Sequence, residues 1–477
     1  MARRFFNRDE ELAALDRRWA SDRGEFLIVY GRRRVGKSRL ITHWGEQRRH
    51  LYIEATAGSE SDQLADVSIE LARVTGRSLH AEQPLTSWRA VFAAFDELLD
   101  DGPIAITLDE FQFVARGNQE IGSLINRFVS RHQDDPRLLL VISGSDVSFF
   151  ERELLGYAAV TYGRRTGSLH LRPFGCFEIA PFVPDWSVAD QIRAWAVWGG
   201  MPFYLAEIDP ALDLGENILR TILAPDALLR NEPAFLFAQE SRIRERDGYI
   251  SALRAIASGQ TRLVEIAERV QRSPTDTRGF LETLEQMNLV ERQRPVGRRV
   301  GKKVSYAITD PFLRFWFRFV APFESRLYSE EAARRHLRET ILPALDQFVS
   351  RDAFEEVCQR WALEHVPGAT EVGRWWGSKR VRTPEGLRNR QYEADVAALD
   401  PDGRLVALGS CKWSDGDHDA GELDKLETVA TLMGADTAPP LYFFDRSGFS
   451  PRLRELARER DDVRLVTTAE LATGSGG

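Results

Sequence analysis

The segment best suited to chemistry is a glycine-rich loop of eight residues that runs from Gly31 to Ser38. It matches the pattern GxxxxGK[ST], in which backbone N–H groups cradle phosphates, the lysine reaches the β- and γ-phosphates, and the hydroxyl binds Mg²⁺. Residues 26–30 before it read as a buried parallel strand, and residues 39–44 after it read as a helix. The residues expected to hold the phosphates are Gly31, Arg32, Arg33, Arg34, Val35, Gly36, Lys37, Ser38 and Arg39.

Lysine usage makes this loop stand out further. The chain has 64 Lys and Arg residues, of which only 6 are Lys, and Lys37 is the only lysine before residue 302. Because an ordinary basic position in this chain receives Arg, a lysine indicates a site that needs a compact ammonium on a flexible stem. We therefore expect Lys37 to contact phosphate.

A second apolar run, residues 103–108, ends in Asp109 and Glu110. Beside a phosphate loop, Asp109 is expected to hold Mg²⁺ together with Ser38, and Glu110 to orient the attacking water as a general base. A third run, residues 137–142, is followed by Ser143-Gly144-Ser145. A polar residue there either senses the γ-phosphate or belongs to an ordinary turn at the end of a strand.

Composition limits the remaining possibilities. At roughly 150 residues per domain, 477 residues predict about three domains. The formal net charge is −8, so any nucleic-acid surface must be local. We find no apolar run near the ~18 residues that a membrane span needs, and the start lacks the apolar stretch of a signal peptide. Three scattered cysteines exclude a disulfide framework and a Cys-based zinc site, and they fit a cytoplasmic protein.

Several motifs together carry a family resemblance. They are residues 6–12, the loop of residues 31–38, residues 107–112, 143–145, 162–166 and 173–174, and Gly199-Gly200-Met201-Pro202. With them, the first third resembles the archaeal-type ATPases, which belong to the signal-transduction (STAND) branch of AAA-like P-loop ATPases. The resemblance implies ATP and Mg²⁺ as cofactors, places Asn7 and Arg8 near the adenine, and places Pro202 in a helical lid. It also makes Arg164 a candidate arginine finger, although any single arginine here has a solvated or ion-paired side chain as its alternative.

The middle of the chain predicts a winged helix-turn-helix. Helical patterns over residues 249–256, 263–270 and 277–288 precede two strands, residues 289–294 and 304–308. The segment 291–303 has six Lys or Arg residues and one Glu, so it is a basic wing. Either it contacts DNA phosphates, or the winged helix is a packing module of the ATPase. The third helix carries one basic residue, Arg278, beside Glu282 and Glu285, which suits a DNA groove poorly.

The last third contains a second set of candidate residues. Glu355 lies in a predicted helix, Asp395 in a strand with an acidic entry, and Lys412 at the end of the next strand. This layout resembles PD-(D/E)XK nucleases, in which two acids hold a divalent cation and the lysine stabilises developing charge, and the domain of unknown function that often follows this ATPase. The expected second acid is replaced by Ser410, a weak ligand for Mg²⁺, although Glu393 is on the same face as Asp395. We therefore expect a degenerate nuclease site.

A second basic segment, residues 374–390, has six Lys or Arg residues against Glu385 alone. It either holds nucleic acid or is a solvated loop. The expected fold is α/β: a P-loop parallel sheet (1–185), a helical lid (186–245), a winged helix (246–325) and a restriction-endonuclease-like α/β domain (330–477). The expected function is that of a Mg-dependent ATPase acting as a nucleotide-driven switch. The alternatives are a DNA-binding regulator, with DNA contacted through residues 291–303 and 374–390, and an ATP-gated nuclease. No feature of the sequence indicates an oligomeric state.

Overall fold

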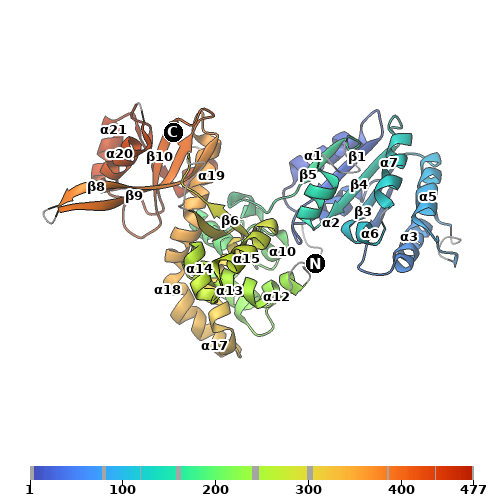
Figure 1. The fold of residues 1–477 in the computed structure, drawn as a ribbon, viewed down its shortest axis with the longest axis horizontal. Helices are drawn as coiled ribbons and strands as arrows, with labels where there is room; N and C mark the ends of the chain where they lie inside the picture. The colour runs from blue at the N-terminus through green and yellow to red at the C-terminus, as the bar shows by residue number, and fades with distance from the viewer. Residues whose placement is uncertain are drawn as a thin grey trace. The chain divides into compact units, whose positions relative to one another are not determined.

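The computed structural model describes residues 5–77, 82–118, 120–156, 163–238, 246–297, 304–383, 386–435 and 437–474. The chain divides into two compact units, and Figure 1 shows the helices and strands of each. Unit 1 comprises Met1–Pro173 with Met201–Phe203, and unit 2 comprises Phe174–Gly200 with Tyr204–Gly477. The finer boundaries expected near residues 186, 246 and 330 stay predictions.

Unit 1 is built on a five-stranded sheet in the order β2-β3-β4-β1-β5, and every pair in it is parallel. The strands are β1 (Glu25–Tyr30), β2 (His50–Glu54), β3 (Ile104–Asp109), β4 (Leu138–Gly144) and β5 (Gly167–His170). All residues of β1, β3 and β4 are buried, as expected for central strands that helices cover on both faces. Because the strands are parallel, their carboxyl ends meet at one edge, which is where the phosphate loop and Asp109 lie.

The helices of unit 1 begin before the first strand and continue between the strands. They are α1 (Asp9–Trp19), α2 (Lys37–Gly45), α3 (Glu60–Thr75), α5 (Trp88–Asp100), α6 (Gln112–Gly117), α7 (Ile121–Arg131), α8 (Val147–Phe149) and the π-helical turn η1 (Phe150–Leu154). Helix α3 begins at a capping box in which the Ser59 side chain accepts from the Asp62 N–H and Asp62 accepts from the Ser59 N–H. Helix α7 buries one apolar face, because its apolar residues recur at helical spacing.

Unit 2 begins with helical segments. They are η2 (Phe177–Phe182), α9 (Val188–Trp198), α10 (Pro202–Leu205), which starts in unit 1, α11 (Leu214–Ile218), η3 (Leu219–Leu223) and α12 (Glu232–Ala238). Helix α9 ends at Trp198 with Gly199 as its C-cap, and the N–H of Phe174 donates to the Gly200 carbonyl at 2.8 Å. The chain therefore leaves α9 through a tight pair of glycines.

Three helices and a two-stranded antiparallel hairpin follow, which is the arrangement of a winged helix. They are α13 (Arg246–Ala257), α14 (Leu263–Val270), α15 (Pro274–Gln286), β6 (Val290–Gln293) and β7 (Ser305–Ile308). The base of the wing packs on the C-terminal domain, because the Val296 N–H donates to the Arg374 carbonyl at 3.0 Å and the Val296 side chain joins that domain's core. Residues 298–303 of the predicted basic wing lie outside the described residues.

A helical connection leads to the C-terminal domain. It consists of α16 (Pro311–Phe319), η4 (Ala321–Arg326), α17 (Glu330–His336), η5 (Leu337–Ile341), α18 (Leu342–Val349), η6 (Ser350–Phe354) and α19 (Glu355–His365). The aromatic side chains of α16 are buried, as expected for a junction. Among the described residues, no helix combines the length and the apolar composition that crossing a bilayer requires.

The C-terminal domain is a mixed sheet in the order β12-β11-β10-β9-β8. Its elements are β8 (Glu371–Thr383), β9 (Gly386–Leu399), β10 (Leu405–Lys412), α20 (Gly421–Met433), β11 (Leu441–Asp445), α21 (Pro451–Glu459), β12 (Val463–Thr467) and α22 (Thr468–Thr473). Strands β8, β9 and β10 pair antiparallel, whereas β10, β11 and β12 pair parallel. The interpretation of residues 374–390 as a solvated loop is wrong, because residues 375–383 pair with residues 386–394 in unbroken cross-strand register as the long β8–β9 hairpin.

Candidate functional site: a phosphate loop beside an acidic strand end

The phosphate loop joins the end of β1 to the start of α2. Gly36 has φ 95°, a left-handed conformation that strains a residue with a Cβ atom, so glycine fits the position. At Gly31 a Cβ would lie 2.3 Å from the Leu171 carbonyl oxygen, so the backbone passes too close for any side chain. The two glycines of the motif therefore shape the loop for separate reasons.

Lys37 is buried and folds back onto its own loop. Its Nζ donates to the carbonyl oxygens of Gly31 at 3.0 Å and Arg32 at 3.3 Å. Burial lowers the pKa of Lys37, and the carboxylates of Glu110 and Asp109 act in the opposite direction. The ammonium thus lies in a closed, partly anionic environment in which a phosphate would be a stronger partner than two carbonyls.

Asp109 is fully buried at the end of β3 and collects four donors. Ser38 Oγ donates to Asp109 Oδ2 at 2.6 Å, and the hydroxyls of Tyr52 and Ser143 donate to Oδ2 and Oδ1. The Glu110 N–H donates to Oδ1 at 2.9 Å. The carboxylate and the Ser38 hydroxyl are hard oxygen donors beside each other, which is the donor set that Mg²⁺ prefers.

Glu110 is positioned by its backbone and by two polar neighbours. It has φ 50°, so the chain turns sharply after Asp109. Its Oε2 accepts from Ser145 Oγ at 2.6 Å and from the amide of Gln112. The predicted pair of serines therefore divides its contacts, since Ser143 binds Asp109 and Ser145 binds Glu110.

Two residues of this site escaped the sequence analysis. Tyr52 lies on β2, whose register places it beside Thr107 of β3, and burial and the Asp109 carboxylate raise its pKa above the ordinary value. Gln112 follows Glu110 by two residues in the motif Thr107-Leu108-Asp109-Glu110-Phe111-Gln112 and leaves its own buried Oε1 without a hydrogen bond. The position of Gln112 after the acidic pair was a signal, whereas Tyr52 gave none.

The remaining predicted nucleotide residues lie at several places in unit 1. Arg8 NH2 donates to the Val35 carbonyl at 3.3 Å and to the Arg172 carbonyl at 2.7 Å, so the opening segment contacts the phosphate loop. Asn7 precedes it with φ 56°. Pro202 lies over the loop, because a Cβ on Gly36 would be 3.7 Å from its Cγ.

The arginines in or predicted near the nucleotide site differ in exposure and contacts. Arg34 lies over the ring of Phe203, with 4.2 Å from its Cζ to the ring centroid. Arg164 is exposed, whereas Arg165 donates to the carbonyls of Leu154 at 3.3 Å and Leu155 at 3.1 Å. Arg165 is thus held by the backbone, and Arg164 is the one with a solvated side chain.

In unit 2, the structure brings two of the three nuclease-like residues together. Burial raises the pKa of Glu355 to about 8, against the opposing effect of Arg374 and with a contribution from Asp395. Burial likewise raises the pKa of Asp395 to about 6, although the Cys411 N–H donates to its Oδ2 at 2.8 Å. Arg374 Nε lies 3.1 Å from Glu355 Oε2. Asp395 is therefore close enough to Glu355 to oppose its ionisation.

Lys412 has other partners. Its Nζ donates to the Asp417 carbonyl, and its charge acts on His418 and Asp445. Ser410 instead lines a pocket of about 310 Å³ with Asp395, Glu422 and Lys425. Among the described residues, no three His, Cys, Asp or Glu side chains are grouped so that they could hold a metal ion. The arrangement of the predicted nuclease residues is therefore incomplete at both Ser410 and Lys412.

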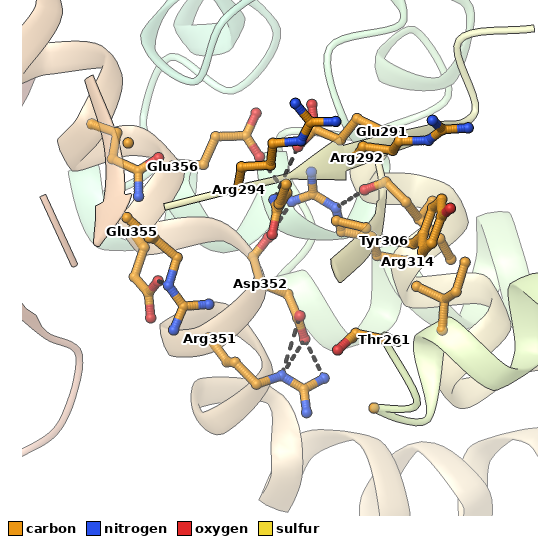
Figure 2. A pocket seen from close by; sticks show the side chains of 18 of the residues that line it. Thr261, Glu291, Arg292, Arg294, Tyr306, Arg314, Arg351, Asp352, Glu355 and Glu356 are labelled. Carbon is orange, nitrogen blue, oxygen red and sulfur yellow. Dashed lines mark hydrogen bonds and ion pairs between the residues drawn. The ribbon is translucent and has the colours of Figure 1, made fainter. Parts of the chain in front are cut away.

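A larger cleft of about 570 Å³ lies between the wing strands, α19 and β8 (Figure 2). Most of its arginines are already paired: Arg314 with Glu356 at 2.8 Å, and Arg351 with Asp352 at 2.7 Å. The described part of the first basic segment, through Arg292 and Arg294, and the start of the second, through Arg374, both line this cleft. Arg292 is bound to Glu285 of α15 at 2.8 Å.

Comparisons with known proteins agree with these two parts. Residues 5–208 match an ATPase domain found predominantly in Archaea, and residues 316–425 match a domain of archaeal and bacterial proteins of unknown function. An uncharacterized protein of Methanocaldococcus jannaschii is 28% identical over 451 residues, which cover 92% of this chain and 94% of the relative. An uncharacterized ATP-binding protein of the same organism is 47% identical over 45 residues, which cover 9% of this chain and 76% of the relative.

Among solved structures, the Walker-type ATPase of Pyrococcus abyssi aligns with a TM-score of 0.49 and 22% identity, covering 66% of this chain and 96% of that chain. The matches of sequence to the two family models span the phosphate loop, the acidic strand end and the nuclease-like strands that the geometry singles out. Residues 5–208 are thus similar to the ATPase domain found predominantly in Archaea, and residues 316–425 are similar to a domain of unknown function from archaeal and bacterial proteins.

Proposed function

We propose that the protein binds Mg·ATP in the phosphate loop and hydrolyses it slowly, as a nucleotide-driven switch. The observation that carries the proposal is the 2.6 Å hydrogen bond between Ser38 and Asp109, next to the buried ammonium of Lys37. These three groups supply the metal ligands and the phosphate counter-charge of a P-loop ATPase. When bound, Mg²⁺ neutralises charge on the β- and γ-phosphates.

In the proposed mechanism, the loop N–H groups and Lys37 bind the phosphates, while Ser38 and Asp109 hold the metal ion. Glu110 accepts a proton from the attacking water, and Ser145 and Gln112 keep its carboxylate oriented. Arg164 is the proposed arginine finger, because its exposed side chain is not committed to backbone carbonyls as Arg165 is. Asn7 and Arg8 would lie beside the base.

Calorimetric titration of the full chain with ATP and Mg²⁺ tests the binding step. We expect Lys37→Ala to abolish measurable affinity, whereas Lys425→Ala, which removes an ion-paired surface lysine of α20, should leave it unchanged. Equal affinity in wild type and Lys37→Ala would contradict the proposal. Glu110→Gln should keep ATP affinity and lose turnover, and Arg164→Ala should slow turnover while Arg17→Ala, at an exposed position of α1, does not.

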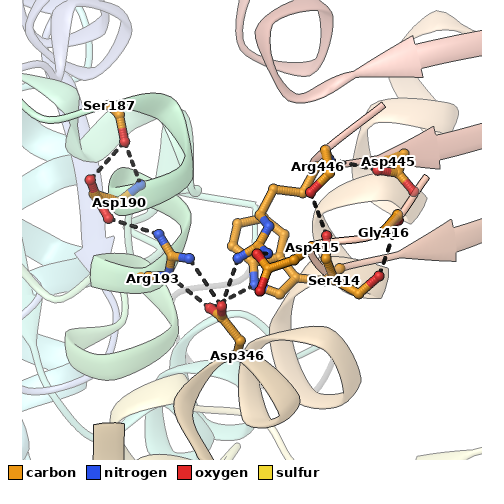
Figure 3. A network of polar contacts seen from close by, with 11 residues as sticks. Ser187, Asp190, Arg193, Asp346, Ser414, Asp415, Gly416, Asp445 and Arg446 are labelled. Carbon is orange, nitrogen blue, oxygen red and sulfur yellow. Dashed lines mark hydrogen bonds and ion pairs between the residues drawn. The ribbon is translucent and has the colours of Figure 1, made fainter. Parts of the chain in front are cut away.

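The proposed switch depends on the covalent path from the phosphate loop into unit 2. Pro202, which lies over Gly36, follows α9 by four residues. On α9, Arg193 binds Asp346 of α18 through its Nε at 2.8 Å (Figure 3). Asp346 also accepts from Arg446 at 2.6 Å, which links α9 to the ends of the nuclease-like strands. A displacement of Pro202 by nucleotide would therefore pull on a helix that is tied to the C-terminal domain.

Hydrogen exchange measures this coupling directly. We expect Mg·ATP to change amide protection in α9 and around Arg446 in the wild-type chain and not in Lys37→Ala. If nucleotide alters exchange in the phosphate loop alone, the protein hydrolyses ATP without acting as this switch.

We propose that the C-terminal domain has lost nuclease activity. Cleavage of DNA or RNA by the wild-type chain but not by Asp395→Ala would contradict this proposal.

A further inference from the structure

The β8–β9 hairpin extends well beyond the sheet to which it belongs (Figure 1). Strand β9 pairs with β10 only between Val396 and Leu399, whereas β8 and β9 remain paired out to Thr383 and Gly386. From Trp375 to Thr383 the strand therefore runs about 25 Å as one edge of a two-stranded ribbon. Because an isolated two-stranded ribbon is only marginally stable in water, its length requires a reason.

The ribbon places like charges opposite each other. Lys379 pairs with Arg390 in the cross-strand register, and Arg388, two residues along β9, lies on the same face. Arg380 lies on the other face, and all four side chains are exposed. Within the described part of the chain, Lys379, Arg380 and Arg390 have no carboxylate at ion-pair distance. Like charges directly opposite each other destabilise a strand pair, so the ribbon carries a cost that its own fold does not offset.

Several arginines elsewhere in the same domain are ion-paired. Arg446 binds Asp346 at 2.6 Å, and Arg460 binds Asp462 at 2.7 Å. What sets the ribbon apart is that Lys379 and Arg390, neither of which has a carboxylate at ion-pair distance within the described residues, stand directly opposite each other across a strand pair. Charges also protect an exposed edge strand against pairing with another chain, but opposite charges across the ribbon would protect it equally well and would attract each other.

We propose that the β8–β9 ribbon is an arm that inserts into the major groove of duplex DNA. That groove is about 12 Å wide and about 8.5 Å deep and admits a two-stranded β-ribbon. The phosphates along its rims would neutralise the cations on both faces and remove the cross-strand repulsion. In A-form RNA the major groove is too deep and narrow for such an arm, so the ribbon selects duplex DNA over duplex RNA.

The arm uses residues other than those of the nucleotide site, and it would place DNA beside the nuclease-like pocket. The base of the ribbon, at Trp375 and Ala394, adjoins Asp395, which lines the pocket of about 310 Å³. The pocket also contains Arg390 and Lys425. DNA held by the arm would thus lie next to a site that has kept Asp395 and lost its second acid at Ser410.

Fluorescence anisotropy of a labelled 30-base-pair duplex, titrated with the full chain at several salt concentrations, tests the arm. The test variant is Lys379→Glu with Arg380→Glu and Arg390→Glu. The matched control is Arg452→Glu with Arg454→Glu and Arg458→Glu, three exposed arginines of α21 in the same domain. At ~0.1 M salt we expect the ribbon variant to lose at least about tenfold in affinity and its salt slope to fall by about 3, because each phosphate contact contributes about 0.9. The control should lose much less.

A neutral variant, Lys379→Thr with Arg390→Thr, separates binding from folding. Threonine favours strands, and the change removes the repulsion, so thermal stability should stay equal or rise while DNA affinity falls. Equal DNA affinity in wild type and both ribbon variants would overturn the proposal. Duplex RNA, single-stranded DNA, poly-glutamate or anionic vesicles binding as tightly as duplex DNA would overturn it too, because a groove-inserted arm discriminates among them. ATP affinity, measured on the same samples, should not change.

Discussion

The Asp346 carboxylate accepts a hydrogen bond from the indole nitrogen of Trp413 at 3.0 Å. Trp413 directly follows Lys412 at the end of β10, and Asp346 belongs to α18, so one bond ties the connecting helices to the edge of the nuclease-like sheet. Arg193 and Arg446 flank the same indole, with 5.5 Å and 5.2 Å from their Cζ atoms to the ring centroid. Asp346 thus holds two cations and an aromatic ring in place at once.

Removing the charge of Asp346 should loosen this junction. We expect Asp346→Asn to destabilise the protein by about 1–2 kcal/mol, because charge-assisted hydrogen bonds contribute more than neutral ones and the partial exposure of the side chain reduces the effect. Urea unfolding of wild type and variant measures it. As a control, Asp402→Asn removes a carboxylate from an exposed pair with Arg404 and should change stability by less than about 0.5 kcal/mol. Equal losses in both variants would contradict the assignment.

The same carboxylate predicts an acid-sensitive contribution to stability. Burial raises the pKa of Asp346, but hydrogen bonds from Arg193, Trp413 and Arg446 outweigh it and lower the pKa to about 2 from 3.8. A carboxyl with a depressed pKa stabilises the folded state above its unfolded pKa and loses that contribution as pH falls. The stability difference between wild type and Asp346→Asn should therefore be constant above pH ~5 and shrink between pH ~4 and ~2. A difference independent of pH would exclude ionisation of Asp346 as its cause.

The raised pKa of Glu355 predicts that stability changes with pH in the opposite direction, and that it does so at higher pH. Because burial favours its neutral form and raises its pKa to about 8 from 4.5, the folded state binds more protons than the unfolded state across that interval. Stability should consequently fall as pH rises from about 4.5 to 8. Glu355→Gln, which cannot ionise, should flatten this decline, and it should be more stable than wild type at pH 8 by at most a few kcal/mol.

Urea unfolding at several pH values measures both proteins. Glu364→Gln, at an exposed position of the same helix, is the matched control and should follow the wild-type curve. If Glu355→Gln declines with pH as steeply as wild type, another group, Asp395 foremost, carries the proton.

The sequence predicted those candidate site residues whose neighbours in the chain form a recognisable pattern. The phosphate loop, Asp109 and Glu110 are recognisable because strand, loop and helix signals lie next to one another in the chain. Tyr52 was missed because its contact with Asp109 exists only once β2 is placed beside β3, 57 residues away in sequence. Asp346 was missed for a similar reason, since its partners come from three other segments.

The β8–β9 ribbon could not be predicted from the sequence for a different reason. Its basic composition was visible in the sequence, and a segment with so many solvated charges is usually predicted as a loop. Its outer part also lacks the alternation of apolar and polar residues that indicates a half-buried strand. The segment forms strand β8 because it pairs with β9 and because Trp375 and Val296 are anchored in the core of the domain. That same anchoring of Val296 favours the winged helix as a packing module, as does the ion pair that joins Glu285 of α15 to Arg292 of β6.

The glycine after α9 should tolerate no side chain. A Cβ on Gly200 would lie 1.8 Å from the Phe174 carbonyl oxygen, and this contact cannot relax without moving backbone. We expect Gly200→Ala to cost at least about 3 kcal/mol. Gly279→Ala, in the open interior of α15, should instead stabilise by up to about 1 kcal/mol because alanine favours helices. Thermal unfolding of the two variants measures both effects, and a neutral Gly200→Ala would mean that the contact between Gly200 and Phe174 is not tightly packed.

Tyr52 should act on the metal-dependent step through Asp109. Its hydroxyl donates to Asp109 Oδ2, the oxygen that also accepts from Ser38. In Tyr52→Phe the carboxylate keeps Ser38 and Ser143 but loses one constraint on its orientation, so we expect ATP affinity without Mg²⁺ to be unchanged. The Mg²⁺ concentration that gives half-maximal hydrolysis should shift several-fold, since partners that orient a metal ligand typically contribute 10–100-fold. Tyr30→Phe, on a strand of the same sheet but without a hydrogen bond to Asp109, is the control. A Tyr52→Phe variant whose Mg²⁺ dependence matches wild type would show that Tyr52 serves packing alone.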